Sequence, residues 1–209
     1  MRLAQPENIH FICCTLMKIT QQHLFSTQTT PRTGRLLIAE PFLNELYFQR
    51  AVILLVHHDH EESMGLVLNH PSETHTHEIL NDFDFSLRIY HGGPVDTQSL
   101  FYLHSFSSLS EAKQLTENLF FGGNWDELMD AMKNEKHPER RVRFFSGYAG
   151  WGAQQLLDEM SEHAWVCIAN YDDASILSKP SDTLWHDSLT SQGPELATFA
   201  HFPLNISDN

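Results

Sequence analysis

Glycines follow a strand-like run in the stretch FSGYAGWGAQQLLDEM, residues 145–160. A strand, a glycine-rich turn and a helix start together build the loops that hold phosphates, because the N–H groups at a helix N-terminus face the anion. A nucleotide-hydrolysing loop also needs a lysine and a Ser or Thr, in the pattern G-x-x-x-x-G-K-[ST]. Gly147, Gly150 and Gly152 give G-x-x-G-x-G without either residue, and the dinucleotide pattern G-x-G-x-x-G is not met. We therefore predict a tight strand-to-helix turn here, with an anion or small-ligand site as the alternative.

A second glycine-rich stretch is His91-Gly92-Gly93-Pro94-Val95. Two adjacent glycines allow a turn, or the close approach of the backbone to another strand or to a ligand. If GGPV and GYAGW face each other, glycine backbone and aromatic rings line one cleft, which is the usual composition of a small-molecule pocket. The candidate ligand-binding residues are Gly92, Gly93, Pro94, His104, Gly147, Tyr148, Gly150, Trp151 and Glu159.

Nucleophilic catalysis needs a Ser or Cys close to a base. Ser146 lies in Phe-Phe-Ser-Gly, which is not the G-x-S-x-G elbow of hydrolases. Cys167 stands in an apolar strand, where a thiol behaves as a small inert hydrophobe. His104 ends another apolar strand, and we expect it to be hydrogen-bonded and partly buried. No catalytic residue is therefore assigned, and the competing hypothesis is a hydrolase that uses these residues with Glu159 around the same cleft.

Histidines gather in one acidic stretch, where His57, His58 and His60 alternate with acidic residues and are followed by His75 and His77. Two histidines at i and i+2 can chelate zinc or nickel. No H-E-x-x-H pattern and no Cys/His framework accompanies them. We predict a solvated acidic loop, no metal site and no cofactor.

The charge balance argues against nucleic acid as a partner. Lys and Arg number 13 against 27 Asp and Glu, which gives a net charge of −14. Such an acidic chain repels a phosphate backbone. Arg140, Arg141 and Arg143 form the only dense basic cluster, and Arg143 has the position of an inward-facing strand residue.

Cysteine usage indicates a reducing compartment, so we predict a cytoplasmic protein. Cys13 and Cys14 are adjacent and precede the recognisable domain, which leaves Cys167 alone inside it. No apolar run approaches the roughly 20 residues that span a bilayer, so no membrane association is predicted.

Hairpins early in the chain and strand–helix alternation later predict an α+β fold with a mixed sheet in a single compact domain. Strands are expected over residues 34–40, 50–58, 64–69, 99–104, 141–146 and 165–170. Helices are expected over 71–83, after an Asn124 cap, over 152–162, and from Ser181 or Asp182 to Gly193. The tail after Gly193 is expected to be extended.

The first 33 residues are predicted to form an extension outside the domain, which would then occupy residues 34–209. Residues 20–33 are polar and lack periodicity. Residues 1–16 are interpreted as a misassigned start or a poorly ordered extension, because Met17 offers an alternative start. A signal peptide is disfavoured, since no basic segment and no small-residue cleavage site are present.

Several stretches resemble one family in their order along the chain. They are GRLLIAEPFL, YFQRAVILLV, MGLVLNHP, YHGGPV, FYLH, FFGGNWDEL, FFSGYAGWGAQQLLDE and AWVCI. On these motifs the chain is identified as a member of the YqgE/AlgH family from about Gly34 to Asn205. The resemblance implies an α+β fold with a bulged, partly overlapped sheet and flanking helices. The chain departs from the family at its FPLN ending and at GAQQL.

The resemblance implies no established biochemical activity, and some members carry the provisional label of transcriptional regulator. The leading hypothesis is a binding or regulatory protein that acts through a partner or small ligand at the cleft of GGPV and GYAGW. A hydrolase is the first alternative, and a transcriptional regulator, disfavoured by the net charge, is the second. The ligand, the partner and the oligomeric state are not predicted.

Overall fold

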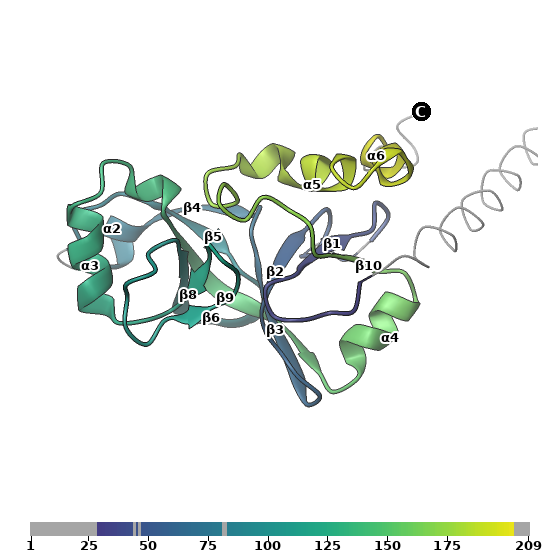
Figure 1. Cartoon of the computed structure of the whole chain (residues 1–209), viewed down its shortest axis with the longest axis horizontal. Helices are drawn as coiled ribbons and strands as arrows, with labels where there is room; N and C mark the ends of the chain where they lie inside the picture. Colours follow the sequence, from purple (N-terminus) through teal and green to yellow (C-terminus); the bar gives the residue numbers. More distant parts are fainter. Residues whose placement is uncertain (1–28, 44, 46, 81–82, 203–209) are drawn as a thin grey trace, which may run out of the picture.

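The computed structural model describes residues 29–43, 45, 47–80 and 83–202, in which the strands form one mixed sheet (Figure 1). The strands are β1 (Leu36–Ala39), β2 (Val52–His58), β3 (Glu62–Val67), β4 (Pro71–His75), β5 (Arg88–His91), β6 (Val95–His104), β7 (Lys113–Gln114), β8 (Phe120–Phe121), β9 (Val142–Gly152) and β10 (Trp165–Ile168). Their order is β10-β1-β2-β3-β9-β6-β8-β7, and β5 joins both β4 and β9. Among the strand pairs of the described residues, only β5–β9 is parallel. The predicted α+β class with a mixed sheet is confirmed.

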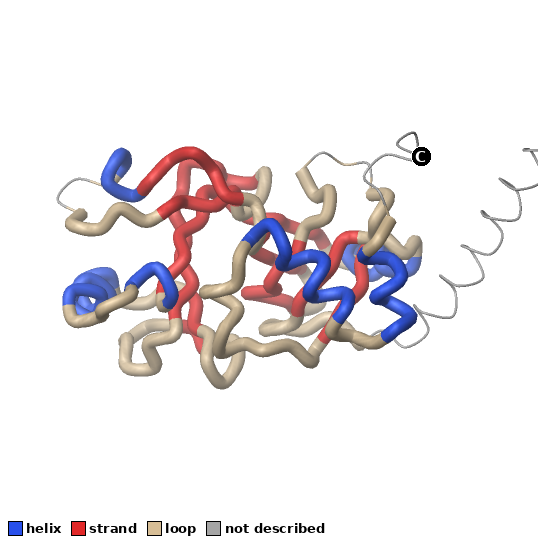
Figure 2. Tube along the Cα trace, turned by 90° about the horizontal axis from the view of Figure 1, so that it is seen from above, coloured by secondary structure: helices blue, strands red, loops and turns tan. Residues whose placement is uncertain are grey.

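Helices cover the sheet on both faces and at one end (Figures 1 and 2). They are α2 (Thr76–Ile79), α3 (Trp125–Lys133), α4 (Gln155–Ser161), α5 (Ser181–Thr190) and α6 (Pro194–Ala200), with a 3-10 turn η1 (Pro138–Arg140). Side chains alternate along a strand, so Leu36 and Ile38 of β1 pack under α5 and α6, whereas Leu37 packs with α4. A bilayer-crossing helix would need more length and apolar character than any helix of the described residues has.

Strand β9 belongs to both halves of the sheet. Its last residues pair with β3, whereas its first residues lie between β5 and β6. The ladder with β6 shifts register between Val95 and Leu100, opposite Gly147, whose φ is +69°. A register shift of this kind is a β-bulge, which bends the strand and increases its twist. The sheet is therefore bulged, as the family resemblance implied.

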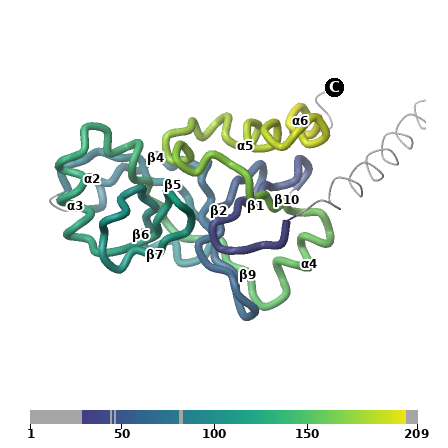
Figure 3. Tube along the Cα trace, in the orientation of Figure 1, coloured from purple at the N-terminus to yellow at the C-terminus, as the bar shows by residue number. Residues whose placement is uncertain are grey.

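The first described strand and the last strand lie side by side (Figure 3). Leu36 of β1 pairs with Ile168 of β10 on one side and with Leu54 of β2 on the other. The N-terminal and C-terminal parts of the described chain thus share one half of the sheet. Residues 1–28 lie outside the described residues, so the predicted extension and alternative start stay predictions.

The predicted hairpin of residues 50–69 is confirmed. Strands β2 and β3 pair antiparallel around a tight turn in which the Asp59 N–H donates to the Glu62 carbonyl at 3.1 Å. The Asp59 carboxylate accepts from the N–H groups of Glu61 and Glu62. These two hydrogen bonds lower the pKa of Asp59 to about 2. The acidic loop is thus an ordered, solvent-facing turn.

The helix predicted over residues 71–83 is wrong for most of that segment. Pro71–His75 form strand β4, and only one helical turn, α2, follows. Hydroxyl side chains favour this outcome because they tie the segment to the next strand. Ser72 donates to the Ile89 carbonyl at 2.8 Å, and Thr76 donates to the Phe85 carbonyl at 2.7 Å. The apolar spacing alone therefore predicted too long a helix.

The glycines of GYAGWG do not form the predicted strand-to-helix turn. Strand β9 continues through Gly152, and α4 begins only at Gln155. The extension has ladder partners, since Glu62 to Gly65 of β3 pair with Gly152 to Ala149. Backbone groups that find partners in a ladder stay in the strand. Among these glycines only Gly147 has a positive φ, at the bend.

The tail after Gly193 is helical, contrary to the extended conformation predicted. Helix α6 begins at Pro194, where proline is favoured because a first-turn N–H needs no partner. Phe199 and Ala200 are buried in the core against α5. Burial of these apolar side chains stabilises the helix, so α5 is not the last helix of the chain. The residue before α5 is Pro180, not the predicted Ser or Asp cap.

Candidate functional site

The two predicted glycine stretches lie together, with backbone against backbone. A Cβ added at Gly93 would lie under 3.0 Å from backbone atoms of Tyr148 and Ala149, and one at Gly92 would lie equally close to the Gly147 carbonyl. The Gly92 N–H donates to the Ser146 carbonyl at 2.9 Å. Of the alternatives opened by the glycine pair, the structure shows the close approach to another strand, β9. Pro94 follows on the way into β6.

The aromatic residues of GYAGW point to opposite faces of β9. The Tyr148 ring is half-buried and meets the Phe101 ring edge-on at 5.7 Å between centroids. Trp151 is buried on the other face, with its ring edge-on to Trp165 at 5.9 Å. Gly150 faces the Tyr148 ring, which would lie 3.2 Å from an added Cβ. A ligand role for these residues stays a prediction.

Glu159 holds helix α4 to the sheet. Its Oε2 accepts from the indole N–H of Trp151 at 2.8 Å and from that of Trp165 at 2.7 Å, and its Oε1 accepts from Gln155 at 2.8 Å. Hydrogen bonds to an ionised carboxylate are roughly twice as strong as neutral ones. The Glu159 carboxylate thus accepts hydrogen bonds from three side chains of this protein.

His104 supports the loop that leads into α3. It is fully buried, its Nε2 donates to the Gly122 carbonyl at 2.8 Å, and its Nδ1 accepts from the Phe106 N–H at 3.2 Å. Burial lowers the pKa of His104, which favours the neutral imidazole that these two bonds require. The Tyr102 hydroxyl donates to the neighbouring Gly123 carbonyl at 2.6 Å. His104 is hydrogen-bonded, as expected, and it is fully rather than partly buried.

Helix α3 begins where its sequence predicts. The Asn124 side chain accepts from the Glu127 N–H at 3.1 Å, which caps the helix. The Glu127 carboxylate accepts from the N–H and the hydroxyl of Ser110 at 2.7 and 2.8 Å, instead of closing a capping box. The start of α3 is therefore fixed both by its own cap and by the 105–112 loop.

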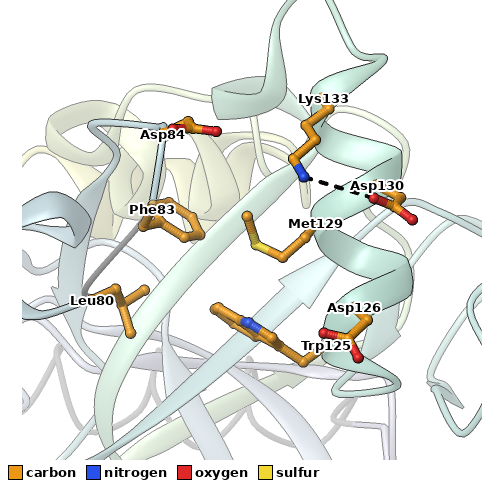
Figure 4. A pocket seen from close by; sticks show the side chains of 8 residues that line it. All are labelled: Leu80, Phe83, Asp84, Trp125, Asp126, Met129, Asp130 and Lys133. Carbon is orange, nitrogen blue, oxygen red and sulfur yellow. Dashed lines mark ion pairs between the residues drawn. The ribbon is translucent and has the colours of Figure 1, made fainter.

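An open groove lies between α3 and three residues that come after α2, namely Leu80, Phe83 and Asp84 (Figure 4). We call it the α3 groove, and its volume is about 600 Å³. It is lined by Leu80, Phe83, Asp84, Trp125, Asp126, Met129, Asp130 and Lys133. The apolar members form the floor, and the charged members stand around it.

The floor of the α3 groove is a supported aromatic surface. Trp125 is 37% exposed, which makes it one of the most exposed large apolar side chains of the described residues. Its ring packs on Phe83 at 6.0 Å, on Tyr102 at 5.9 Å and on Phe144 at 6.2 Å between centroids. Aromatic pairs at these distances hold each other in defined orientations. The exposed face of the indole is therefore held in place before anything binds to it.

The charges around the α3 groove are mostly negative. Asp84 stands on one side of the floor, and Asp126 and Asp130 stand on the α3 side. The Lys133 ammonium lies 3.8 Å from Asp130. Asp84 and Asp126 make no ion pair with another described residue. The groove thus combines an apolar floor with uncompensated carboxylates.

The residues of the hydrolase hypothesis are engaged elsewhere. The Ser146 hydroxyl donates to the Thr97 carbonyl at 2.7 Å. Cys167 is 2% exposed, and burial raises the pKa of its thiol. Both environments oppose nucleophilic attack, because a nucleophile must be deprotonated and accessible.

The side chains of the histidine stretch pair locally at the end of the β2–β3 hairpin. Within the described part of the chain, no group of three His, Cys, Asp or Glu side chains is placed to hold an ion. His57 pairs with Asp59 at 3.1 Å, and the Nδ1 of His58 lies 2.7 Å from the Ser63 hydroxyl. The stretch is a hairpin end with local pairs.

The sequence prediction missed the α3 groove. It predicted a helix after Asn124 but no groove beside it, and Met129 of that helix lines the groove. The sequence did carry one signal for the groove, because Trp125 lies four residues before Met129 on the same side of the helix. Together with Leu128 and Met132 they form an apolar stripe that is wider than one packed element covers, which leaves part of it exposed. Phe83 was expected only as part of a helix.

A family profile and individual relatives both match most of this chain. The profile of the AlgH-like family matches residues 36–197. A UPF0301 protein of Bacteroides thetaiotaomicron is 32% identical over 180 residues, which are 85% of this chain and 91% of that protein. A UPF0301 protein of Parabacteroides distasonis is 33% identical over 192 residues, 90% of this chain and 94% of that protein.

Two solved structures share the fold. The solution structure of the AlgH protein from Pseudomonas aeruginosa superposes with a TM-score of 0.63 and 29% identity, covering 85% of this chain and 98% of that one. A crystal structure of a protein from Corynebacterium diphtheriae has a TM-score of 0.71, 21% identity and coverage of 84% and 94%.

Proposed function

The chain belongs to the AlgH-like family, and from this premise we propose that it is a binding protein without catalytic activity that holds a partner in the α3 groove. The observation that carries this proposal is the indole of Trp125, which is 37% exposed and is seated on three other rings in the floor of an open groove. Tryptophan in such a position is the side chain that contributes most to binding in protein interfaces.

The elements beneath the groove support a binding role, because they fix its shape. His104 and Tyr102 hold the carbonyls of Gly122 and Gly123 just before α3. A binding site works best when the residues that contact the ligand are held in place by packing and hydrogen bonds from the residues behind them. His104, expected from the sequence to stand near a ligand, contributes here from behind the site.

The proposal differs from the cleft expected between GGPV and GYAGW. In that region, neighbouring backbone occupies the space beside Gly92 and Gly93. The α3 groove, in contrast, has open volume and an exposed aromatic side chain. We also propose a cytoplasmic location from the cysteine usage, and no direct role on nucleic acid because the net charge is −14.

Site-specific photo-cross-linking in cells tests the proposal. A benzoylphenylalanine in place of Asp130 samples the groove, and one in place of Asp158 on α4 samples an exposed acidic position of another helix. We expect a discrete adduct from position 130 alone, abolished by a second substitution, Trp125→Ala. Equal adducts from both positions, or an adduct indifferent to Trp125→Ala, would count against the groove as the binding site.

A further inference from the structure

We infer that the partner held in the α3 groove is a protein segment that carries a lysine or arginine next to a large apolar side chain. This inference rests on the proposed binding role and adds the chemistry of the occupant. It follows from the floor, the charges and the openness of the groove.

The floor selects an apolar or cationic side chain. Its lining comes from Trp125, Met129 and Leu80, together with the buried Phe83 that packs against Trp125. Methionine adapts its shape to irregular apolar partners, and the face of an indole attracts a guanidinium or ammonium group. Both a large apolar side chain and a cation therefore gain contacts on the same floor.

The carboxylates favour a cation and disfavour an anion. Asp84 and Asp126 stand on opposite sides of the floor without a described ion-pair partner, whereas Lys133 lies beside Asp130. A cation on the floor therefore has a carboxylate on either side, and exposed charges attract one another over about 8 Å at physiological salt. The chain as a whole, at −14, adds to this attraction over longer distances.

The openness of the groove favours a protein segment over a small molecule or a metal ion. Asp130 and Lys133 have side-chain exposures of 80% and 54%, so the groove does not enclose its contents. Small-molecule pockets bury about 70–90% of their ligand. A bare cation would not use the apolar floor. A segment that spans the groove uses both the floor and the carboxylates.

Peptide titrations with Trp125 as the reporter test the inference. The chain has four tryptophans, and the other three are 5% exposed or less, so a peptide in the groove changes mainly the emission of Trp125. The probes are a twelve-residue peptide of Lys and Leu, its counterpart with Glu for Lys, and its counterpart with Ser for Leu. We expect only the Lys/Leu peptide to bind, with an affinity that falls about tenfold from low to high salt.

Two charge-matched double variants complete the experiment. Asp84→Asn with Asp126→Asn removes two charges from the groove, and Asp158→Asn with Glu162→Gln removes two from exposed positions of α4 and its end. We expect the first pair to weaken the Lys/Leu peptide at least about fivefold and the second pair less than twofold. Both pairs preserve side-chain shape, so the fold is retained.

Four results would overturn the inference. They are equal binding of the Glu/Leu peptide, equal binding of the Lys/Ser peptide, equal losses from the two double variants, and no binding of any peptide. A groove adduct in the cross-linking experiment together with any of these results would leave the binding role standing and reject only the cationic, apolar class.

Discussion

Gly93→Ala tests whether the glycine pair of GGPV exists for strand packing. An added Cβ would lie under 3.0 Å from the Tyr148 carbonyl carbon and oxygen and from the Ala149 nitrogen. These are backbone atoms of β9, the strand shared by both halves of the sheet. They cannot move aside as a flexible side chain would, so the strands must separate locally.

The expected loss is about 3–5 kcal/mol of the free energy of unfolding. Overpacking a buried site costs about 1–3 kcal/mol by itself. Separation of the strands also lengthens ladder hydrogen bonds, each worth about 1 kcal/mol. In a domain of this size, about 2–4 °C of melting temperature accompanies each kcal/mol, so we expect the melting temperature to fall by roughly 6–20 °C.

The matched control is Gly152→Ala, at the end of the same strand. A Cβ there meets nothing within 4 Å, and alanine restricts the unfolded chain more than glycine does. We therefore expect a change within about 1 kcal/mol, of stabilising sign. Urea unfolding followed by the emission of the buried tryptophans measures both variants. Equal midpoints for Gly93→Ala and the wild type would refute the packing argument and return the glycine pair to a ligand role.

Three further substitutions probe other contacts. Arg143→Met leaves three backbone carbonyls without the buried guanidinium that donates to them, so urea unfolding should show a loss of at least about 3 kcal/mol. Glu159→Gln replaces the carboxylate that accepts two indole N–H groups; a loss of about 1–3 kcal/mol with altered tryptophan emission is expected, and an unchanged spectrum would contradict it. Burial lowers the pKa of His104, as it does for His58 and His70. As the pH drops, these histidines are therefore protonated in the unfolded chain before they are protonated in the folded chain, so stability should fall below about pH 6.5. His104→Gln keeps the donor without the titration, and unfolding at pH 7 and pH 5.5 should show a weaker pH dependence than in the wild type.

Local signals predicted local structure well. The Asn124 cap, the β2–β3 hairpin and the buried strand around Cys167 depend on neighbours in the chain, and all three form as predicted. Arg143 also points inward, as its strand position indicated. These features need no information about distant segments.

Two features that depend on distant partners were not predicted from the sequence. GYAGWG looks like a turn because its glycines are compatible with one, yet the unpaired edges of β3 and β6 extend it as a strand. The α3 groove joins Phe83 to Trp125, and four strands, β5 to β8, separate these residues in the chain. The wide apolar stripe of α3 indicates a partner for that helix, but no periodicity within either segment reports that Phe83 supplies it.

The position of β1 between β2 and β10 determines when the sheet can be completed during synthesis. During synthesis β1 and β2 emerge early and can pair at once, but β10 leaves the ribosome only after nearly the whole sheet has been made. Until then, one edge of β1 offers unpaired backbone groups beside the apolar residues Leu36 to Ala39, and such an edge is where nascent chains associate wrongly. Completion of the sheet thus waits on translation, and chaperones that shield strand edges would act mainly in that interval.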